Sequence, residues 1–280
     1  MNKRYNNKLE AILSSVRNDL EARKKAVSLA TLERQAARRG TPRTIGPRLG
    51  NRPGIIAEIK RASPSKGWIR QELDAARYAK IYEDAGACAV STLTERHFFG
   101  GSLSDLEDAS SATREVPILR KDFLLDEYMI VESRAHGADL VLLIAAILGK
   151  ETPAMVRMAR GYGLAPLVEV HDESELAIAV DAGAGIIGVN NRDLVTFTVD
   201  LGTSERLLPR IPAGAIKVVE SGIRSASDLR RFAGLGADLF LVGETLVRSE
   251  DPARAIRDLL QEKTTIERTK EEGEWKRKSS

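Results

Sequence analysis

The sequence predicts an α/β fold in which eight short apolar strands alternate with helices and close into a parallel barrel, preceded by an N-terminal helical extension. Two observations lead to this prediction. A helix-like segment that ends in Gly-Ala and passes directly into an apolar strand occurs four times, at residues 84–93, 135–144, 181–190 and 234–243. The repeats are roughly 50 residues apart, about twice the length of one strand–helix unit, so another strand should lie within each interval.

The eight expected strands can be placed in chain order. The first is residues 55–60, four end the repeats, and three lie between the repeats at 116–121, 165–170 and 216–220. Segments such as 126–136 and 172–182 are typical of helices. Strands that alternate with helices run parallel, because a crossover is needed to return the chain. Eight such units indicate a (β/α)8 barrel, the TIM barrel, and the absence of an obvious switch point disfavours an open doubly wound sheet.

The glycines of the four repeats are expected to end their helices. They are Gly86, Gly137, Gly183 and Gly236. A helix commonly ends on a left-handed residue, and glycine adopts that conformation without the steric cost of a side chain. Residues 183–188 also match the GxGxxG pattern, but they precede a strand instead of opening a helix, so we discard a dinucleotide site.

The N-terminal segment is expected to form an amphipathic helix. Apolar residues recur at three- and four-residue spacing at Leu9, Ile12, Leu13, Val16 and Leu20. We therefore expect a helical extension at 1–50, a catalytic barrel at 51–262 and a charged, disordered tail at 263–280. Residues 1–50 hold twelve Lys/Arg and four Asp/Glu, which we interpret as the solvated face of that helix.

Composition limits the class of protein. The chain of 280 residues is 42% hydrophobic and carries a formal net charge of +3. Its longest apolar runs, such as 140–148, are too short to span a bilayer, and no secretion signal is recognisable. A single cysteine, Cys88, excludes an internal disulfide, and neither CxxC nor HExxH occurs. We expect a cytoplasmic monomer or weak homo-oligomer with no membrane or nucleic-acid partner and no metal.

Polar side chains gather at the ends of the expected strands, where a barrel of this kind has its active site. They are Glu58 and Lys60 from the first strand, Lys121 from the third, Glu169 from the fifth, Asn190 from the sixth, and Glu220 with Ser221 from the seventh. The period of two puts each of the strand residues in phase with the inward side of its strand. Buried ion pairs add little net stability, so this set favours a site that binds an anion and moves protons.

Glycines after the last two strands indicate phosphate binding. Gly222 and Gly243 let backbone N–H groups approach an anion, as in other barrels of this class. Glu244 is awkward there, because its carboxylate must point away from a phosphate or repel it. Trp68, Phe98 and Phe99 are candidates either for contact with an aromatic substrate or for packing within their own loops. The three histidines, His97, His136 and His171, lack the spacing of a metal site.

Together the motifs resemble one family. The stretches IIAEIKRASPSKG, PILRKDFLLDEYMI, LVEVHDESEL, IGVNNRDL, VVESGI and LVGETLV are similar to those of indole-3-glycerol phosphate synthase, a carboxy-lyase (EC 4.1.1.48) of tryptophan biosynthesis. The resemblance covers residues 8–262. It implies conversion of 1-(2-carboxyphenylamino)-1-deoxyribulose 5-phosphate to indole-3-glycerol phosphate with loss of carbon dioxide and water, without a metal or organic cofactor.

The resemblance also implies roles for single residues. The positions that match the family's functional residues are Glu58, Lys60, Ser63, Lys121, Glu169, Asn190, Arg192, Glu220, Ser221, Gly222 and Gly243. Lys121 is expected to be the general acid, with its pKa lowered by burial and neighbours, while Glu169 and Glu58 serve the dehydration. Ser63, Lys60 and Arg192 would hold the substrate, and Asn190, Glu220 and Ser221 would orient hydroxyls and lysines. The position of Glu244 is commonly serine in the family, so its backbone N–H is the expected phosphate contact.

Two other interpretations remain at this point. Another phosphosugar barrel, such as phosphoribosylanthranilate isomerase, would not explain the Glu58 and Lys60 pair together with the N-terminal extension. The alternative from a different class is an inactive barrel that binds nucleic acid or an acidic partner through its basic N-terminal arm. The complete polar set at the strand ends disfavours that alternative.

Overall fold

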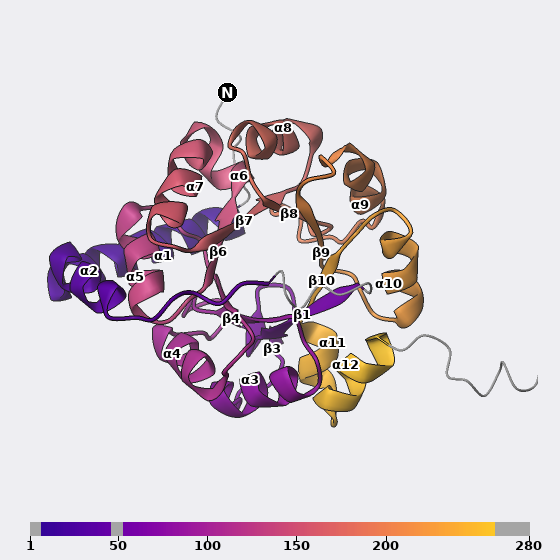
Figure 1. Ribbon diagram of the computed structural model, residues 1–280, viewed down its shortest axis with the longest axis horizontal. Helices are drawn as coiled ribbons and strands as arrows, with labels where there is room; N and C mark the ends of the chain where they lie inside the picture. Colours follow the sequence, from indigo (N-terminus) through magenta and orange to yellow (C-terminus); the bar gives the residue numbers. More distant parts are fainter. Residues whose placement is uncertain (1–6, 46–52, 261–280) are drawn as a thin grey trace, which may run out of the picture.

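The computed structural model describes residues 7–45 and 53–260, and it confirms the predicted barrel. Eight parallel strands close in the order β1-β10-β9-β8-β7-β6-β5-β4, with helices arranged around them (Figure 1). The strands are β1 (Gly54–Ile59), β4 (Ala89–Leu93), β5 (Ile118–Lys121), β6 (Leu140–Ile144), β7 (Ala165–Val170), β8 (Ile186–Asn190), β9 (Ile216–Glu220) and β10 (Leu239–Val242). Each predicted strand is therefore present, with ends that shift by one or two residues.

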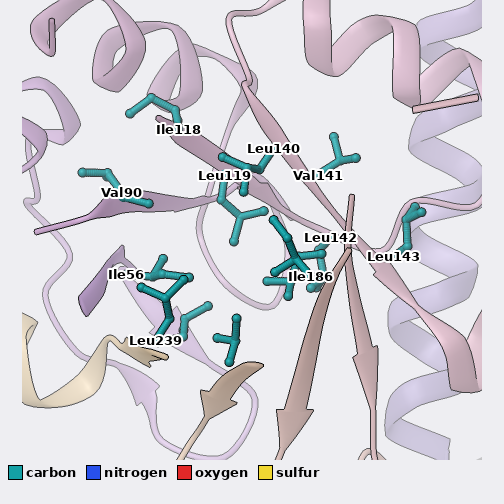
Figure 2. Close-up of a cluster of buried hydrophobic side chains, with 14 of the residues drawn as sticks. Ile56, Val90, Ile118, Leu119, Leu140, Val141, Leu142, Leu143, Ile186 and Leu239 are labelled. Carbon is teal, nitrogen blue, oxygen red and sulfur yellow. The ribbon is translucent and has the colours of Figure 1, made fainter. Parts of the chain in front are cut away.

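The core has an inner and an outer layer because each strand is buried on both faces. Ile56, Leu119 and Leu142 point into the centre of the barrel, whereas Val141 and Leu143 point outward toward the helices (Figure 2). All six residues of β1 are buried, which is the pattern of a strand covered by helices on one side and by packed side chains on the other. Burying one such leucine or isoleucine stabilises the fold by about 1.5–3 kcal/mol, so the apolar residues of the strands contribute a large part of the stability of the barrel.

Helices follow the barrel strands. They are α3 (Ala75–Asp84), α4 (Leu103–Ala112), α5 (Glu127–Ala135), α6 (Ala145–Leu148), α7 (Thr152–Gly161), α8 (Glu173–Asp181), α9 (Gly202–Leu207), α10 (Ala226–Ala233), α11 (Glu244–Arg248) and α12 (Pro252–Leu260). The two with predicted bounds, at 126–136 and 172–182, are α5 and α8 to within one residue. Gly86, Gly137, Gly183 and Gly236 have φ of 92°, 90°, 68° and 90°. The left-handed conformation expected at these four helix ends is confirmed. Among the described helices, none is long and apolar enough to cross a membrane.

The first strand-to-helix connection contains structure that the sequence did not predict. A short antiparallel hairpin forms from β2 (Ala62–Ser63) and β3 (Gly67–Trp68). Trp68 remains 59% exposed. A Cβ built on Gly100 would lie only 2.8 Å from the Trp68 ring, so this ring packs against the loop that contains Gly100. The hairpin places Ser63 at the mouth of the barrel, directly after β1.

The N-terminal extension is helical and packs on the barrel. It consists of α1 (Asn7–Ala26) and α2 (Leu29–Ala37), and all five apolar residues predicted for its buried face are at most 5% exposed. Arg23 pairs with Glu132 of α5 at 2.8 Å, and α2 lies beside α5 (Figure 1). Arg43, further along, pairs with Asp139 at 2.8 Å, next to the start of β6. The extension thus runs from one end of the barrel to the other. The expected boundary near residue 50 and the expected tail at 263–280 fall outside the described residues.

Candidate active site

One cavity of about 970 Å³ opens at the carboxyl ends of the barrel strands. All the residues predicted for the site line it, namely Glu58, Lys60, Ser63, Lys121, Glu169, Asn190, Arg192, Glu220, Ser221, Gly222, Gly243 and Glu244. The inward phase expected for the strand ends is therefore confirmed, including for Lys60, which lies one residue beyond the end of β1. A cavity of this size matches the sites that bind small molecules.

A lysine whose side chain is 15% exposed lies between two buried carboxyl groups at the centre of the cavity. Lys121 Nζ lies 3.5 Å from Glu169 Oε2 and 3.5 Å from Glu220 Oε2. The three side chains come from β5, β7 and β9, and alternate strands of a barrel present their inward residues in one layer. Register therefore brings together residues that are up to a hundred positions apart in the chain.

The pKa of Lys121 differs from the sequence-based expectation. Burial alone would lower it, but the negative charges of Glu169, Glu220 and Glu58 outweigh burial and raise the pKa of the ammonium above its ordinary value of 10.5. The expectation that burial and neighbours lower this pKa is wrong, because the neighbours are carboxylates and favour the protonated ammonium. Lys121 is a lysine that stays protonated throughout the neutral range.

Glu169 and Glu220 have opposite protonation preferences although they face the same ammonium. Burial raises the pKa of Glu169, but Lys121, His171 and the Asn190 amide outweigh burial and lower it below its ordinary value. For Glu220, burial and the charge of Glu169 together raise the pKa to about 8. Two carboxyl groups whose environments separate their pKa values are suited to act as a base and an acid. At neutral pH the site holds an ionised Glu169 and a largely protonated Glu220.

Two glycines provide the space for the buried carboxylates. Gly188 lies in the middle of β8, and a Cβ at this position would collide with Glu220 Oε1. Gly243, just after β10, has the same relation to Glu58 Oε1. Neither glycine has a left-handed φ, so the requirement at both positions is one of space. The family resemblance assigned Gly243 to phosphate binding, and the structure adds that this glycine accommodates Glu58.

Glu58 and Lys60 form a second ion pair at the rim of the cavity. Lys60 Nζ lies 2.7 Å from Glu58 Oε1, as two residues on the same face of a strand allow. Burial raises the pKa of Glu58, but the nearby Lys60 and Lys121 outweigh it and lower the pKa. Glu58 is therefore a carboxylate at neutral pH, with an ammonium on either side.

The loop after β9 has a strained backbone that opens toward the cavity. Ser221 and Gly222 have φ of 65° and 86°, and a non-glycine residue in this region costs about 1–3 kcal/mol. Asn191 holds the loop in place, because its side-chain N–H donates to the Ser221 carbonyl at 3.0 Å and its own Oδ1 accepts from the Ser204 N–H at 3.0 Å. The sequence reasoning missed Asn191, which is buried and does not line the cavity. Its only signal was its place after Asn190 at the end of a strand.

Asn190 and Arg192 are fixed by hydrogen bonds in the loop after β8. Asn190 Oδ1 accepts from the Arg192 backbone N–H at 3.0 Å, and Arg192 Nη1 donates to the Phe197 carbonyl at 2.9 Å. Arg192 lines the cavity, and one of its guanidinium N–H groups is used in the hydrogen bond to the Phe197 carbonyl. Its remaining donors are available to a ligand.

The charge of Glu244 is balanced within its own helix. Arg248 Nε donates to Glu244 Oε1 at 3.0 Å, one helical turn further on in α11. Burial raises the pKa of Glu244, but the bond to Arg248 outweighs it, with help from Lys66 and Lys60, and lowers the pKa. The carboxylate that looked incompatible with a phosphate is thus paired with a cation and lies among other cations that line the same cavity.

The side of the cavity opposite the glycine loops carries an apolar patch beside Lys121 and Asp122. It is made by Leu93, Phe99, Phe123, Leu142 and Ile144. These residues come from β4, β5, β6 and their loops, whereas Gly222 and Gly243 follow β9 and β10 on the other side of the closed barrel. Of the three aromatic candidates, Phe99 lines the cavity, with its ring 6.1 Å from that of Phe123, whereas Trp68 and Phe98 do not line it. An elongated ligand with an aromatic end and an anionic end would fit this asymmetry.

Metal-binding geometry is not found in the part of the chain that the structure describes. Within residues 7–45 and 53–260, no three His, Cys, Asp or Glu side chains come together in a way that could hold a metal ion. The three histidines lie apart, and each has a carboxylate beside it: His97 has Asp19, His136 has Glu107 and His171 has Glu169 and Glu175.

Comparison with known proteins gives a consistent result. A family model described as indole-3-glycerol phosphate synthase matches residues 9–259. A protein of that name from Parafrankia sp. (strain EAN1pec) is 47% identical over 256 residues, covering 91% of this chain and 95% of the relative. Indole-3-glycerol phosphate synthase 1 from Streptomyces coelicolor is 49% identical, covering 90% of this chain and 94% of the relative.

Solved structures with low sequence identity share the fold. A 3-hexulose-6-phosphate synthase has a TM-score of 0.59 at 16% identity and covers 74% of this chain and 97% of that one. A tryptophan synthase alpha-subunit from Pyrococcus furiosus has a TM-score of 0.58 at 14% identity, covering 75% and 98%. These two likenesses support the barrel alone. The family match along residues 9–259 and the near-half identity to its curated relatives show that the chain belongs to the indole-3-glycerol phosphate synthase family.

Proposed function

We propose that this chain closes the indole ring of 1-(2-carboxyphenylamino)-1-deoxyribulose 5-phosphate, forming indole-3-glycerol phosphate, carbon dioxide and water. Membership of the family supports this activity. The observation that carries it furthest is the composition of the cavity, in which Lys121 lies 3.5 Å from both Glu169 and Glu220, between an apolar patch and two glycine loops. The substrate has an aromatic ring at one end, a phosphate at the other and a carbonyl between them.

The two ends of the substrate determine its orientation. The anthranilate ring lies against Phe99, Phe123 and the apolar strand ends next to them, because this is the side of the cavity that gains from excluding water. The phosphate lies at the loops of Gly222 and Gly243, where backbone N–H groups and nearby cations bind an anion. The ribulose carbonyl then lies in the middle of the cavity, near Lys121.

Ring closure requires an acid at the carbonyl oxygen. The ring carbon that bears the carboxylate attacks the carbonyl carbon, a carbon–carbon bond forms, and negative charge develops on the oxygen. Lys121 donates a proton to that oxygen, and even with a raised pKa its ammonium is a stronger acid than the alcohol that results. The carboxylate then leaves as carbon dioxide, and its bonding electrons return to the ring. Lys60 and Arg192 hold the carboxylate or phosphate until then.

Dehydration requires one acid and one base. The new hydroxyl leaves as water when it receives a proton, while the ring N–H loses its proton and a carbon–nitrogen double bond forms and rearranges to the aromatic indole. Glu169 and Glu58 are the proposed pair, as the family resemblance implies. Both have lowered pKa values, so each enters the reaction as a carboxylate and must take a proton before it can donate one. Glu220, which has a raised pKa, is the neighbouring group that can supply such a proton.

The remaining residues position the reacting groups. Asn190 supports Glu169, and Ser221, with its left-handed backbone, presents its hydroxyl to the cavity together with Ser63. Four cations of the basic N-terminal arm, Arg23, Lys24, Arg39 and Arg43, are used in contacts with the barrel. These contacts within the protein do not favour the alternative of a binding protein whose N-terminal arm binds nucleic acid.

A direct assay tests the proposal. Purified chain is mixed with 1-(2-carboxyphenylamino)-1-deoxyribulose 5-phosphate, and product is followed by indole fluorescence and by release of carbon dioxide in equal amount. We expect steady turnover without added metal or cofactor. Absence of product, together with a salt-dependent gel shift with nucleic acid, would instead support the binding-protein alternative.

A further inference from the structure

His171 lies directly behind the catalytic carboxylate and has no role in the reaction described above. It follows β7 and precedes α8, and its side chain is 12% exposed. Its Nε2 is 3.3 Å from Glu169 Oε1, and its Nδ1 is 2.9 Å from Glu175 Oε2. The imidazole therefore lies between one carboxylate that lines the cavity and another that does not.

The partners of the ring determine its protonation state. An ionised carboxylate only accepts hydrogen bonds, whereas a neutral imidazole has one nitrogen that can only accept. With a carboxylate at each nitrogen, both nitrogens must carry a proton, which makes the ring an imidazolium. Burial alone would lower the pKa of His171, but Glu169 and Glu175 outweigh burial and raise it to about 10. The Nε2 group makes no well-aligned hydrogen bond within the described residues, so its attraction to Glu169 is mainly one between charges.

Glu175 holds the imidazolium rigidly. It lies in the first turn of α8 and is 4% exposed. Its Oε2 accepts both from the His171 ring and from the His171 backbone N–H, at 2.8 Å for the latter. Asp172, the cap of the same helix, accepts from the Glu175 backbone N–H at 2.9 Å. The ring is thus tied to the start of a helix and can rotate little.

Glu169 consequently has a different cation at each oxygen. His171 lies at Oε1 and Lys121 lies at Oε2. The other titratable groups near this pair are Glu220 from β9, Glu58 from β1 and Asp193 from the loop after β8, and the charge of His171 also acts on Asp193. Without His171, Glu169 would face Lys121 alone in a buried cluster with two further carboxyl groups.

We propose that His171, held as an imidazolium by Glu175, is a positioning residue that keeps Glu169 ionised and keeps its Oε2 turned toward Lys121. The proposal depends on the proposed function, because it requires Glu169 to move a proton during turnover. His171 is not a catalytic residue in this scheme, since it does not line the cavity. It acts through the electrostatic state and the orientation of its neighbour.

The kinetic test uses His171→Asn, which removes the cation and keeps a polar side chain. Losing an opposite charge beside Glu169 should raise the pKa of that carboxyl by about one unit, so the acid limb of the kcat profile moves to higher pH by about that amount. Glu169 stays ionised at neutral pH after such a shift, so the loss of kcat there comes from its orientation: we expect about a tenfold fall because Oε2 is no longer held toward Lys121. KM should change less than about twofold, because the substrate contacts remain. Glu175→Gln, which weakens the hold on the ring, should produce smaller changes in the same direction.

The matched control is His136→Asn. His136 also pairs with a glutamate, Glu107, at 3.1 Å, but it lies at the end of α5 and away from the cavity. Its kcat and pH profile should equal those of the unmodified chain. If His171→Asn lowers the melting temperature but leaves kcat and the acid limb per folded molecule unchanged, His171 is only structural and the proposal is wrong.

A spectroscopic test separates this proposal from the proposed function. In a ¹⁵N NMR titration of the three histidines, the signal that disappears in His171→Asn should stay in the doubly protonated form at pH 8. A neutral His171 at pH 8 would overturn the proposal whatever the kinetics show. If the unmodified chain makes no product, the proposed function fails, and this titration still decides the state of the ring.

Discussion

Replacing Lys121 by methionine tests the centre of the site most directly. Methionine has a similar length and no charge, so it removes the ammonium and retains most of the volume. The ion pair with the ionised Glu169, at 3.5 Å, amounts to about 5 kcal/mol at an effective dielectric constant of about 20, and Glu220, largely protonated at neutral pH, adds less although it lies at the same distance. Desolvation of the ammonium offsets part of this sum, and removing one partner of a buried pair typically costs about 3–5 kcal/mol.

The effect on catalysis should exceed the effect on folding. Loss of the proton donor should lower kcat by at least ~10²-fold, the usual contribution of a general acid. Indole fluorescence under substrate saturation measures this, and circular dichroism checks that the variant is folded. Lys80→Met is the matched control, because Lys80 is a half-exposed lysine that also pairs with two carboxylates, and solvent screening means that its loss should change neither kcat nor stability appreciably.

The stability of Lys121→Met should also depend on pH in a defined direction. Without the ammonium, the pKa of Glu220 rises further above its unfolded value, and the pKa of Glu169 also rises, although His171 still pairs with it. The folded state then binds more protons than the unfolded state, so the variant is most stable at low pH and loses stability as pH rises. Near-normal turnover by a folded Lys121→Met would refute the assignment of the acid, and pH-independent stability would refute the electrostatic reasoning.

Three further predictions concern other parts of the structure. The pKa of Glu220 is raised from 4.5 to about 8, so its protonated form contributes stability that is fully present below pH 4.5 and is lost as the pH rises through 8. The melting temperature should therefore fall over this pH range, and Glu220→Gln should make that fall smaller. Gly188→Ala should displace the Glu220 carboxylate, lowering kcat and costing about 1–3 kcal/mol in denaturant unfolding, whereas Gly214→Ala, with nothing within 4 Å, should change neither. Arg43→Ala should lower stability by about 1–3 kcal/mol through its lost bonds to Asp139, with kcat intact at low temperature; a fall in kcat there would contradict a purely structural role.

Much of the fold and the membership of the site could be predicted because both depend on local rules. The period of two along each strand placed Glu58, Lys121 and Glu169 on the inward face, and no long-range information was needed. The glycine ending each repeat, such as Gly86, could be recognised from the helix on one side and the strand on the other.

The electrostatic state of the site could not be predicted in the same way. Whether the pKa of Lys121 rises or falls depends on how many carboxylates approach it in three dimensions, and Glu220 belongs to a strand almost a hundred residues away. Asn191 and His171 were missed for a related reason. Each acts on a neighbour of the cavity without lining it, and polar residues after a strand are common in any barrel.

The N-terminal extension has a consequence for how the chain folds during synthesis. The bond from Arg23 to Glu132 spans 109 residues, and that from Lys24 to Asp126 spans 102. The helix carrying Arg23 and Lys24 therefore cannot make these contacts until α5 has also been made, which at ordinary translation rates takes about 5–20 seconds, and Lys8 at its start waits longer still for Phe197. We expect this interval to be the period in which the nascent polypeptide depends most on chaperones, because a long loop must close before the helix finds its partner.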